Sequence, residues 1–458
     1  MKPLSIQEVV IATGGELIGQ DSMKSICSVS TDTRSLGEGS LFVALSGENF
    51  DGHHFTDTAV ANGAGCLLLS SLPDDVEALN VPIILVKNTL YGLQRLAKWY
   101  RQELDIKVVA LTGSNGKTST KDFTAAVLSE VFKVNATKGN LNNHIGLPLT
   151  VLATEEDDNV CVWEMGMNHA GEIAPLCDIA QPNVGIITNI GTAHIEHLGS
   201  REGIAEEKAS LARALREDGT LIVTAGCDFV DYLIERSVSK VIVTGNCRGE
   251  VRAENLKIKE EGSSFELCID GQDPVSVDLA VSGKHMVNNA LLAAAAGVVL
   301  EMKASDIAAG LNSAVLTSGR LRRYDCDGIT VIDDTYNANP DSVIAAIDTL
   351  TDMPMQNGSR RVVVLGMMAE LGVHANTEHQ RVGRIAAERG LQVVSVGYEA
   401  EEIYRGAEQV CKDSKHFAGL TEAADWLREF CEKGDKVLFK GSRMAGMENV
   451  MNKAFPNS

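Results

Sequence analysis

The chain has 458 residues and 44% of them are hydrophobic, which is enough for large buried cores and suggests about three domains. Its formal net charge of −21 argues against a nucleic-acid partner and against an anionic membrane surface, because both repel a strongly acidic protein. Any phosphate group must therefore be bound by local loops rather than by a general basic surface.

The cysteines and the N-terminus indicate a cytoplasmic protein. The ten cysteines are scattered, with no C-x-x-C pair and no metal-ligand spacing, so we expect reduced thiols that are mostly small core residues. Residues 1–8 lack the apolar core of a signal peptide. The longest apolar run, residues 290–300, is too short to span a bilayer, so we expect a buried helix there and no stable membrane insertion.

Residues 1–86 are predicted to form a small α/β domain. A capping box at residues 5–8 starts a short helix, and apolar strands are expected at 40–45, 66–69 and 83–86, with a helix at 56–63. Two polar turns interrupt these elements, and their local pattern favours turn chemistry with solvated charge. The residues that could instead bind a ligand in these turns are Thr33, Arg34, Gly47, Asp51, Gly52 and His53.

Residues 87–316 form the predicted central domain, which opens with an amphipathic helix at 90–104. An apolar strand then leads into a glycine-containing loop, and a helical pattern follows at 122–131. Glycines let backbone N–H groups surround a phosphate, the helix N-terminus adds partial positive charge, Lys117 can pair the outer phosphates and Thr118 can hold Mg²⁺. Leu111 stands where the first glycine of a full phosphate-loop pattern belongs. The predicted nucleotide-binding residues of this loop are Gly113, Ser114, Asn115, Gly116, Lys117, Thr118 and Ser119.

Beyond this loop, short apolar strands at 160–163, 184–187 and 221–223 alternate with helical stretches. Such alternation predicts parallel strands joined by crossover helices, so ligands should collect at the carboxyl ends of the strands. Glu164 follows one of these strands directly, where an Mg²⁺ ligand would lie, although a surface glutamate is the alternative. His194 follows another strand, and it could be a ligand or a packed residue. Lys208 lies in the helical stretch 201–215 among acidic residues, where the pattern favours a solvated charge on an exposed face.

Two stretches of this domain are rich in amides. Residues 138–148 include Asn142 and Asn143, which suit either hydrogen bonding to a polar ligand or a turn-rich connector. Residues 282–290 run into an alanine-rich helix, and there Asn288 and Asn289 could contact a base edge or could only cap the helix.

Residues 317–458 alternate again and predict a compact Rossmann-like domain. Strands are expected at 329–332, 362–365, 393–396 and 437–440, with helices at 340–350 and 379–388; Asn339-Pro340 is a good helix start. Polar residues gather at two strand ends, where they could bind a phosphate, a carboxylate or a ring. They are Asp334, Tyr336, Asn337, Lys440, Ser442 and Arg443.

Taken together, these stretches resemble the Mur ligase family, ATP-dependent amide-forming enzymes of peptidoglycan synthesis. The resemblance spans nearly the whole chain and rests on residues 32–34, 51–53, 112–118, 164–166, 193–194, 208, 288–289, 318–320 and 440–443. Residues 139–143 and 333–342 are similar to one branch, which joins D-alanyl-D-alanine to UDP-N-acetylmuramoyl-tripeptide. An Asp-Asn-Pro-Arg stretch like that of the diaminopimelate-adding branch does not occur in the sequence.

The resemblance implies roles for these residues. Thr33, Arg34 and the 47–53 loop would bind the UDP sugar. Lys117 would hold the β- and γ-phosphates of ATP. Two Mg²⁺ ions are implied, one held by Thr118 and Glu164 and the other by His194. Lys208 looks like the lysine that CO₂ carbamylates in this family, which would turn it into a metal ligand. The adenine nucleotide would meet Asn288, Asn289, Arg320 and Tyr336, and candidate residues for the peptide substrates are Asn142, Asn143, Asp334, Asn337, Lys440, Ser442 and Arg443.

The implied reaction is amide synthesis through an acyl phosphate in a cytoplasmic, monomeric enzyme of three domains. One position departs from the branch, because Met367 stands where an aspartate is expected, whereas Glu370 and His379 match. The nearest alternative is a sibling Mur-type or folylpolyglutamate-type ligase with another amine acceptor. A slow ATP-hydrolysing switch and a non-catalytic nucleotide-sugar binder are the alternatives of other classes.

Overall fold

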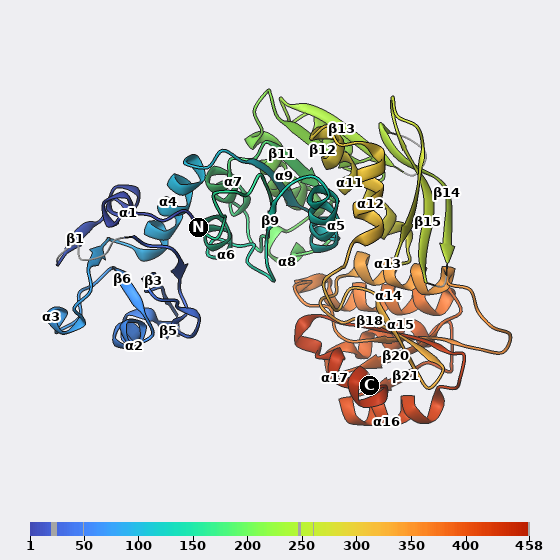
Figure 1. Cartoon of the computed structure of the whole chain (residues 1–458). Coiled ribbons are helices and arrows are strands. Elements are labelled where there is room, and N and C mark those ends of the chain that lie inside the picture. Colours follow the sequence, from blue (N-terminus) through green and yellow to red (C-terminus); the bar gives the residue numbers. More distant parts are fainter. Residues whose placement is uncertain (20–24, 49, 246–248, 260, 457–458) are drawn as a thin grey trace.

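The computed structural model describes residues 1–19, 25–48, 50–245, 249–259 and 261–456, which form three successive α/β units (Figure 1). Each unit is built on its own main sheet, of five, nine and six strands in chain order. The predicted fold class, three α/β domains with a parallel central sheet and a Rossmann-like C-terminal domain, agrees with this architecture. Within the described residues, no helix has the length and apolar character needed to cross a lipid bilayer.

The N-terminal unit has a mostly parallel sheet in the order β1-β7-β6-β3-β2, in which only β1 pairs antiparallel. The capping box of the first helix forms as predicted, because Ser5 and Glu8 exchange side-chain-to-backbone hydrogen bonds. The elements are α1 (Ile6–Thr13), β1 (Glu16–Ile18), β2 (Val29–Ser30), β3 (Ser40–Val43), β4 (Ser46–Gly47), β5 (Phe50–Asp51), α2 (Thr56–Ala61), β6 (Ala64–Leu69), α3 (Val76–Leu79) and β7 (Ile83–Leu85).

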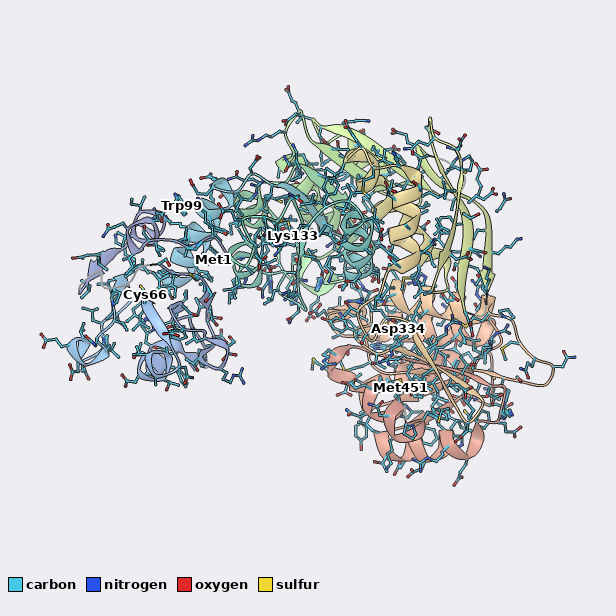
Figure 2. The ribbon with its side chains drawn as sticks, viewed as in Figure 1. Met1, Cys66, Trp99, Lys133, Asp334 and Met451 are labelled. Atoms are coloured by element: carbon cyan, nitrogen blue, oxygen red, sulfur yellow. The ribbon has the colours of Figure 1, made fainter. Side chains whose placement is uncertain are left out.

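Helix α4 (Thr89–Gln102) joins this unit to the central one (Figure 1). Its buried side packs against α1 on one end and against α6 and α7 of the central unit on the other. Tyr100 fastens the junction: its hydroxyl accepts a hydrogen bond from the Lys2 backbone N–H at 2.6 Å and donates to the Thr154 carbonyl at 2.8 Å. Figure 2 shows Met1 and Trp99 in the region where the N-terminal and central units meet.

The central sheet has the order β16-β15-β14-β13-β12-β11-β8-β10-β9, and its strands from β8 to β14 are parallel to one another. At one edge, β15 pairs antiparallel with β14, and β16 pairs antiparallel with β15. The parallel strands agree with the predicted parallel central sheet, and the antiparallel meander at its edge is a feature that the alternating pattern did not predict. The strands are β8 (Lys107–Thr112), β9 (Val134–Ala136), β10 (Val160–Glu164), β11 (Val184–Ile187), β12 (Thr220–Thr224), β13 (Lys240–Gly245), β14 (Val251–Lys259), β15 (Gly262–Ile269) and β16 (Val275–Leu279).

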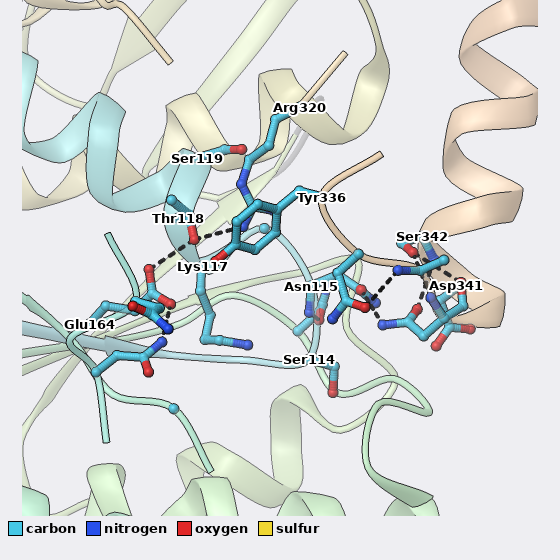
Figure 3. Close-up of a pocket in the computed structure, with 18 of the residues that line it drawn as sticks. Ser114, Asn115, Lys117, Thr118, Ser119, Glu164, Arg320, Tyr336, Asp341 and Ser342 are labelled. Atoms are coloured by element: carbon cyan, nitrogen blue, oxygen red, sulfur yellow. Dashed lines mark hydrogen bonds between the residues drawn. The ribbon is translucent and has the colours of Figure 1, made fainter. Parts of the chain in front are cut away.

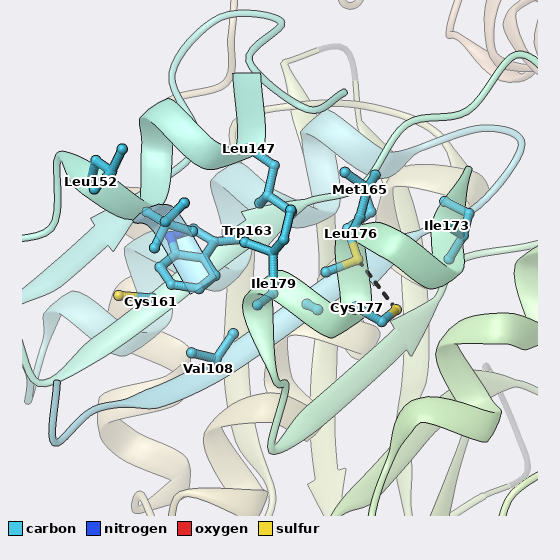
Figure 4. Close-up of a cluster of buried hydrophobic side chains, with 14 of the residues drawn as sticks. Val108, Leu147, Leu152, Cys161, Trp163, Met165, Ile173, Leu176, Cys177 and Ile179 are labelled. Carbon is cyan, nitrogen blue, oxygen red and sulfur yellow. Dashed lines mark hydrogen bonds between the residues drawn. The ribbon is translucent and has the colours of Figure 1, made fainter. Parts of the chain in front are cut away.

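Helices cover both faces of the central sheet. One face carries α5, α11 and α12 over a core of alanine, valine and leucine side chains, and the predicted buried helix at 290–300 is part of α11. The other face carries α6, α7 and α9. Figure 4 shows Trp163 on this face among Leu147, Leu176 and Ile179. Its indole N–H donates to Asn135 Oδ1 at 3.1 Å. The helices are α5 (Lys117–Ser129), α6 (Gly146–Leu152), α7 (Ile173–Ala180), α8 (Ile195–Leu198), α9 (Arg201–Ala214), α10 (Val230–Ile234), α11 (Lys284–Val299) and α12 (Ala304–Ser313).

The C-terminal sheet has the order β17-β18-β22-β19-β20-β21, with β17 antiparallel at one edge and the other strands parallel. Two apolar cores lie on its two faces, as in a Rossmann-like domain. Its elements are β17 (Arg322–Cys326), β18 (Ile329–Asp334), α13 (Pro340–Asp352), β19 (Arg361–Leu365), α14 (Ala375–Glu388), β20 (Gln392–Val396), α15 (Glu401–Glu408), β21 (Lys415–Phe417), α16 (Leu420–Phe430), β22 (Lys436–Lys440) and α17 (Met447–Ala454).

Most of the described cysteines are buried, which agrees with their predicted part as small core residues: Cys66, Cys161, Cys177, Cys227, Cys268 and Cys431. The predicted central and C-terminal strands and helices differ from the observed ones mainly by a few residues at their ends. The side of the C-terminal domain that carries α13 faces the central domain, and Asp334 lies at that junction (Figures 1 and 2).

Candidate active site

A cavity of about 430 Å³ lies between the central and C-terminal domains. It is lined by the phosphate loop, the amide-rich stretch 139–144, the ends of β10 and β18, and the first turns of α11 and α13. Both sheets present their carboxyl ends here, where open parallel sheets bind ligands. The predicted site residues among its lining are Ser114, Asn115, Gly116, Lys117, Thr118, Ser119, Asn142, Asn143, Glu164, His194, Asn289, Arg320, Asp334, Tyr336, Asn337 and Lys440.

The phosphate loop has the predicted form, since β8 ends at Thr112 and α5 begins at Lys117. Gly116 has a φ of 78°, and a Cβ there would lie 2.5 Å from Asn289 Oδ1. At Gly113 a Cβ would lie 1.8 Å from the Thr188 hydroxyl. Both positions therefore require glycine, because the backbone has to pass close to neighbouring side chains.

The Lys117 ammonium is folded back onto its own loop and donates to the Gly113 carbonyl at 2.7 Å. Burial lowers the pKa of Lys117, while the nearby Glu164 carboxylate partly opposes that shift. Lys117 is the first residue of α5, and its ammonium is poorly hydrated. It is therefore well placed to exchange the Gly113 carbonyl for the oxygens of a phosphate.

Glu164 ends β10 and is buried, which decides against the surface-glutamate alternative. Its Oε2 accepts a hydrogen bond from the Thr118 hydroxyl at 3.0 Å, and its Oε1 accepts one from the Asn142 amide at 2.7 Å. Arg320, from the start of the C-terminal domain, donates to the same Thr118 hydroxyl at 2.9 Å. The oxygens of Thr118 and Glu164 thus lie together beside the phosphate loop (Figure 3).

His194 lies at the end of the loop that follows β11, in a left-handed conformation with φ 63°. Its Nδ1 is 2.5 Å from Oε2 of Glu370, which comes from the C-terminal domain. This short contact between an imidazole and a carboxylate joins the central and C-terminal domains. The same contact lowers the pKa of Glu370. Glu370, which matches the pattern of the branch, therefore lies at the domain junction. It is close in sequence to Met367, the residue that departs from that pattern.

Lys208 contradicts the prediction of an exposed, solvated charge. It lies within α9 and is only 1% exposed. Burial moves the pKa of Lys208 well below its usual value, the Lys117 charge lowers it further, and Glu207 opposes both. Glu207 is itself occupied by the N–H groups of Gly171 and Ile173, each at 2.7 Å. Lys208 is therefore a buried amine whose neutral form is favoured, and it does not line the cavity.

The side chains fit Mg²⁺ only together with a bound nucleotide. Among the residues with described coordinates, no three His, Cys, Asp or Glu side chains converge closely enough to bind a metal ion by themselves. Mg²⁺ in nucleotide sites takes one or two protein oxygens and completes its shell with phosphate oxygens and water. The paired oxygens of Thr118 and Glu164 match that requirement.

Arg320, Tyr336 and Asn289, the predicted contacts of the adenine nucleotide, also line the cavity. The Arg320 guanidinium stacks over the Tyr336 ring at 4.5 Å, and Asn289 is buried in the first half of α11. Asn288 does not line the cavity, so it is less well placed than its neighbour. His285, which sequence reasoning did not single out, also lines it, and burial lowers the pKa of His285 to about 4. Its position beside a helix start gave no signal by itself.

On the C-terminal side, the Lys440 ammonium donates to Asp334 Oδ2 at 2.6 Å and to the Asn337 carbonyl at 2.9 Å. Burial raises the pKa of Asp334 and the Lys440 charge opposes that shift. Ser442 is buried without lining the cavity, and its N–H donates to the Met367 carbonyl at 2.9 Å. Arg443 is exposed and paired with Glu448 at 3.3 Å, so neither of these two predicted substrate residues reaches the cavity.

The predicted UDP-sugar residues lie apart from the cavity, on the N-terminal unit. Asp32 caps the turn that contains Thr33 and pairs with the exposed Arg34 at 2.6 Å. Asp51 caps the next turn and lies 2.6 Å from His53 Nδ1. Gly52 has no room for a Cβ, which would lie 2.9 Å from the Ala44 and Leu45 backbone, and Gly47 belongs to the β4–β5 hairpin. The turn chemistry expected from the local pattern is therefore present; Asn49, within the predicted 47–53 loop, lies outside the described residues.

Comparisons with known proteins identify the family of the chain. Three family models match: "Mur ligase family, catalytic domain" over residues 25–101, "Mur ligase middle domain" over 111–297 and "Mur ligase, glutamate ligase domain" over 319–443. The chain is 39% identical over 434 residues to the UDP-N-acetylmuramoyl-tripeptide–D-alanyl-D-alanine ligase of Bacillus subtilis, covering 93% of this chain and 92% of that protein. It is 37% identical to the Escherichia coli enzyme of the same name, covering 98% of both chains.

Solved structures give the same result. A crystal structure of MurF from Acinetobacter baumannii matches with a TM-score of 0.92 and 34% identity, covering 99% of each chain. MurF ligase from Thermotoga maritima, in complex with ADP, matches with a TM-score of 0.82 and 28% identity, covering 93% of this chain and 96% of that one. By the agreement of sequence, fold and site, this chain belongs to the Mur ligase family.

Proposed function

We propose that the protein is an ATP-dependent ligase that joins D-alanyl-D-alanine to the tripeptide of UDP-N-acetylmuramoyl-tripeptide, giving the pentapeptide precursor of peptidoglycan. The observation that carries this proposal is the interdomain cavity, where the phosphate loop and Glu164 face the amide-rich 139–144 stretch and the Asp334–Lys440 pair. The two stretches that are similar to one branch of the family, 139–143 and 333–342, meet at this cavity. The relatives of 39% and 37% identity carry the name of this activity.

The first chemical step is attack of the tripeptide's terminal carboxylate on the γ-phosphorus of ATP, which forms an acyl phosphate and releases ADP. Lys117 and the N-terminus of α5 bind the outer phosphates and stabilise charge as it develops on them. Thr118 and Glu164 would hold one Mg²⁺ and His194 a second, and Mg²⁺ supplies further neutralisation of the phosphate oxygens when it is bound. The amine of D-alanyl-D-alanine then attacks the acyl carbon, and inorganic phosphate leaves.

Lys208 supports the proposed carbamate through its environment. A buried lysine whose pKa is lowered has a free amine, which can attack CO₂ with loss of one proton and form an N–C bond. The product would carry a negative charge, which the nearby Lys117 charge would favour. The carbamylated Lys208 would then hold a metal ion together with His194.

The adenine nucleotide is proposed to lie against Asn289, Arg320 and Tyr336, because these side chains line the cavity beyond the phosphate loop. Asn142, Asn143, Asp334, Asn337 and Lys440 are the proposed contacts of the peptide substrates. The UDP end of the long tripeptide substrate is proposed to lie on the N-terminal unit, at the turns of Thr33–Arg34 and Gly47–His53. The proposed domain boundaries are 1–86, 87–316 and 317–458. The protein is also proposed to be a cytoplasmic monomer, and light scattering after size exclusion would test its oligomeric state.

The decisive assay measures phosphate release from ATP and Mg²⁺ with each substrate left out in turn. Release only when both UDP-N-acetylmuramoyl-tripeptide and D-alanyl-D-alanine are present, with a matching UDP-pentapeptide, is the expected result. Release without either substrate would indicate an ATPase or a switch instead. No release with both would favour a sibling ligase, and other amine acceptors would then be tested in the same assay.

A further inference from the structure

Helix α13 of the C-terminal domain begins beside the phosphate loop of the central domain (Figure 3). Its N-cap, Asn339, uses both ends of its side-chain amide. Oδ1 accepts a hydrogen bond from the Ser342 N–H at 3.0 Å, which caps the helix. Nδ2 donates to Oδ1 of Asn115, a phosphate-loop residue, at 2.7 Å. A single side chain therefore both starts a helix of one domain and holds the phosphate loop of the other.

Asp341, two residues further on, makes a second contact between the same domains. Its Oδ2 accepts hydrogen bonds from the Thr192 N–H at 2.7 Å and from the Thr192 hydroxyl at 2.9 Å. The carboxylate lies so close to the central domain that a Cβ on Gly191 would be 2.4 Å from Oδ2. Hydrogen bonds to an ionised carboxylate are stronger than those between neutral groups. The Asp341 contact should therefore stabilise the docked domains in addition to the Asn339 contact.

The Thr192 segment in turn supports the phosphate loop. In the loop at 188–194, Asn189 Oδ1 accepts a hydrogen bond from the Asn115 N–H at 2.9 Å. The Gly191 N–H donates to the Ser114 hydroxyl at 2.8 Å. Asn339 and Asp341 therefore contact two neighbouring loops that also hold each other, and the second of these loops ends in His194.

We propose that Asn339 and Asp341 are positioning residues that clamp the C-terminal domain onto the phosphate loop and the 188–194 loop. Through this clamp, the phosphate loop and His194 reach their working arrangement only when the two domains are docked. The proposal rests on the proposed function, since it explains how that site is assembled. Neither residue needs to contact the reacting atoms, because each acts through Asn115 or Thr192.

Two variants separate the clamp from simple helix capping. Asn339→Asp keeps a good N-cap, because aspartate caps helices as well as asparagine does. It loses the Nδ2 donor, however, and places a carboxylate oxygen against Asn115 Oδ1. The matched control is Ser342→Ala, which removes the other capping hydrogen bond of the same turn, from the Asn339 N–H to the Ser342 hydroxyl at 3.0 Å, but no contact between domains.

Two quantities are measured on the full-length protein. One is the rate of backbone hydrogen exchange in the segment 188–198, and the other is the affinity of the protein for ADP. Loss of one hydrogen bond with an added repulsion corresponds to a change of about tenfold. We expect Asn339→Asp to exchange about tenfold faster in that segment and to bind ADP about tenfold more weakly, with Ser342→Ala within twofold of the wild type. Asp341→Ala should behave like Asn339→Asp, and Asp341→Asn, which retains an acceptor oxygen, should largely restore both values.

Equal behaviour of Asn339→Asp and Ser342→Ala in both readouts would overturn the clamp. Turnover of the wild type decides the proposed function separately. Wild-type turnover with both substrates, together with an unchanged exchange rate in Asn339→Asp and Asp341→Ala, would remove the clamp alone. Faster exchange in these variants with no wild-type turnover would remove the proposed function and leave the clamp standing.

Discussion

Lys208 illustrates how the surroundings of one residue decide its chemistry. Its sequence neighbours Glu202, Glu206 and Glu207 favour an exposed helix face, but the structure turns Lys208 inward and leaves its ammonium buried. Local pattern could not predict this, because the side of a helix that is buried depends on what packs against it. Only the resemblance to a family gave a reason to expect Lys208 in a site rather than on an exposed face. Glu164, by contrast, was predicted from its place at the end of a buried strand.

Replacing Lys208 by methionine is expected to separate stability from activity. A lysine whose pKa is lower in the folded than in the unfolded state lowers stability at every pH below its unfolded pKa, and that loss shrinks as the pH rises towards that value. In CO₂-depleted buffer at pH 7, Lys208→Met should therefore raise the Tm by a few degrees, which corresponds to about 1 kcal/mol. Turnover should fall at least about a hundredfold. Calorimetry and phosphate release check the two values, and an active variant would exclude Lys208 from the site.

His285 predicts a pH dependence of stability. Its pKa is lowered to about 4 in the folded state, whereas an unfolded histidine titrates near 6.5, so the unfolded chain binds the extra proton between these values. The free energy of unfolding should therefore fall as the pH drops from about 6.5 to 4, and this residue should contribute about 2 kcal/mol to the fall, allowing for its partial contact with water. Urea unfolding at several pH values would test this against His285→Gln, in which that part of the slope should disappear.

At the scale of elements, the strands, helices and phosphate loop follow largely from the sequence, because apolar periodicity and glycine spacing are local signals. The predicted turn from β8 into α5 at Gly113 to Lys117 is observed. The antiparallel β15 and β16 were missed, since strand direction depends on pairing with distant strands. Asn339 was recognised as a helix cap, but its contact with Asn115 joins residues 224 positions apart and has no local signature.

Gly116→Ala tests the close packing of the phosphate loop. The added Cβ would lie 2.5 Å from Asn289 Oδ1 at a φ of 78°, so both strain and contact should displace the loop. We expect ADP affinity to fall at least about tenfold, with a loss of stability of about 1–2 kcal/mol. Gly271→Ala is the matched control, because Gly271 has a φ of 81° and nothing within 4 Å of its Cβ position. Equal ADP binding by both variants would contradict the account of this loop.

At the scale of the whole molecule, the site exists only where domains meet. The sequence predicted three α/β units, but it could not predict which loops of the central and C-terminal domains would touch, such as Glu370 with His194. Nor could it predict that the N-terminal candidates would lie apart from the cavity. A substrate long enough to have its UDP end on one unit and its peptide end in the cavity accounts for this separation.

Nucleotide binding should stabilise the docked central and C-terminal domains together. At an ADP concentration one hundred times its dissociation constant, the expected gain is about 2.7 kcal/mol, because the ligand binds only the folded state. Lys117→Ala should lose most of this gain, since the Lys117 ammonium lies on the phosphate loop, 2.7 Å from the Gly113 carbonyl oxygen. Thermal unfolding with and without ADP measures the difference. An equal shift in the variant would contradict the assigned role of Lys117.

The most direct test of the ligase assignment uses UDP-N-acetylmuramoyl-tripeptide with ¹⁸O in its terminal carboxylate, together with ATP, Mg²⁺ and D-alanyl-D-alanine. Mass spectrometry then follows the UDP product and the released phosphate. Attack of the carboxylate on ATP predicts one UDP-pentapeptide for each phosphate released, with one ¹⁸O in that phosphate and one in the new amide. Unlabelled phosphate, or ADP formation without the pentapeptide, would contradict the mechanism and the assignment respectively.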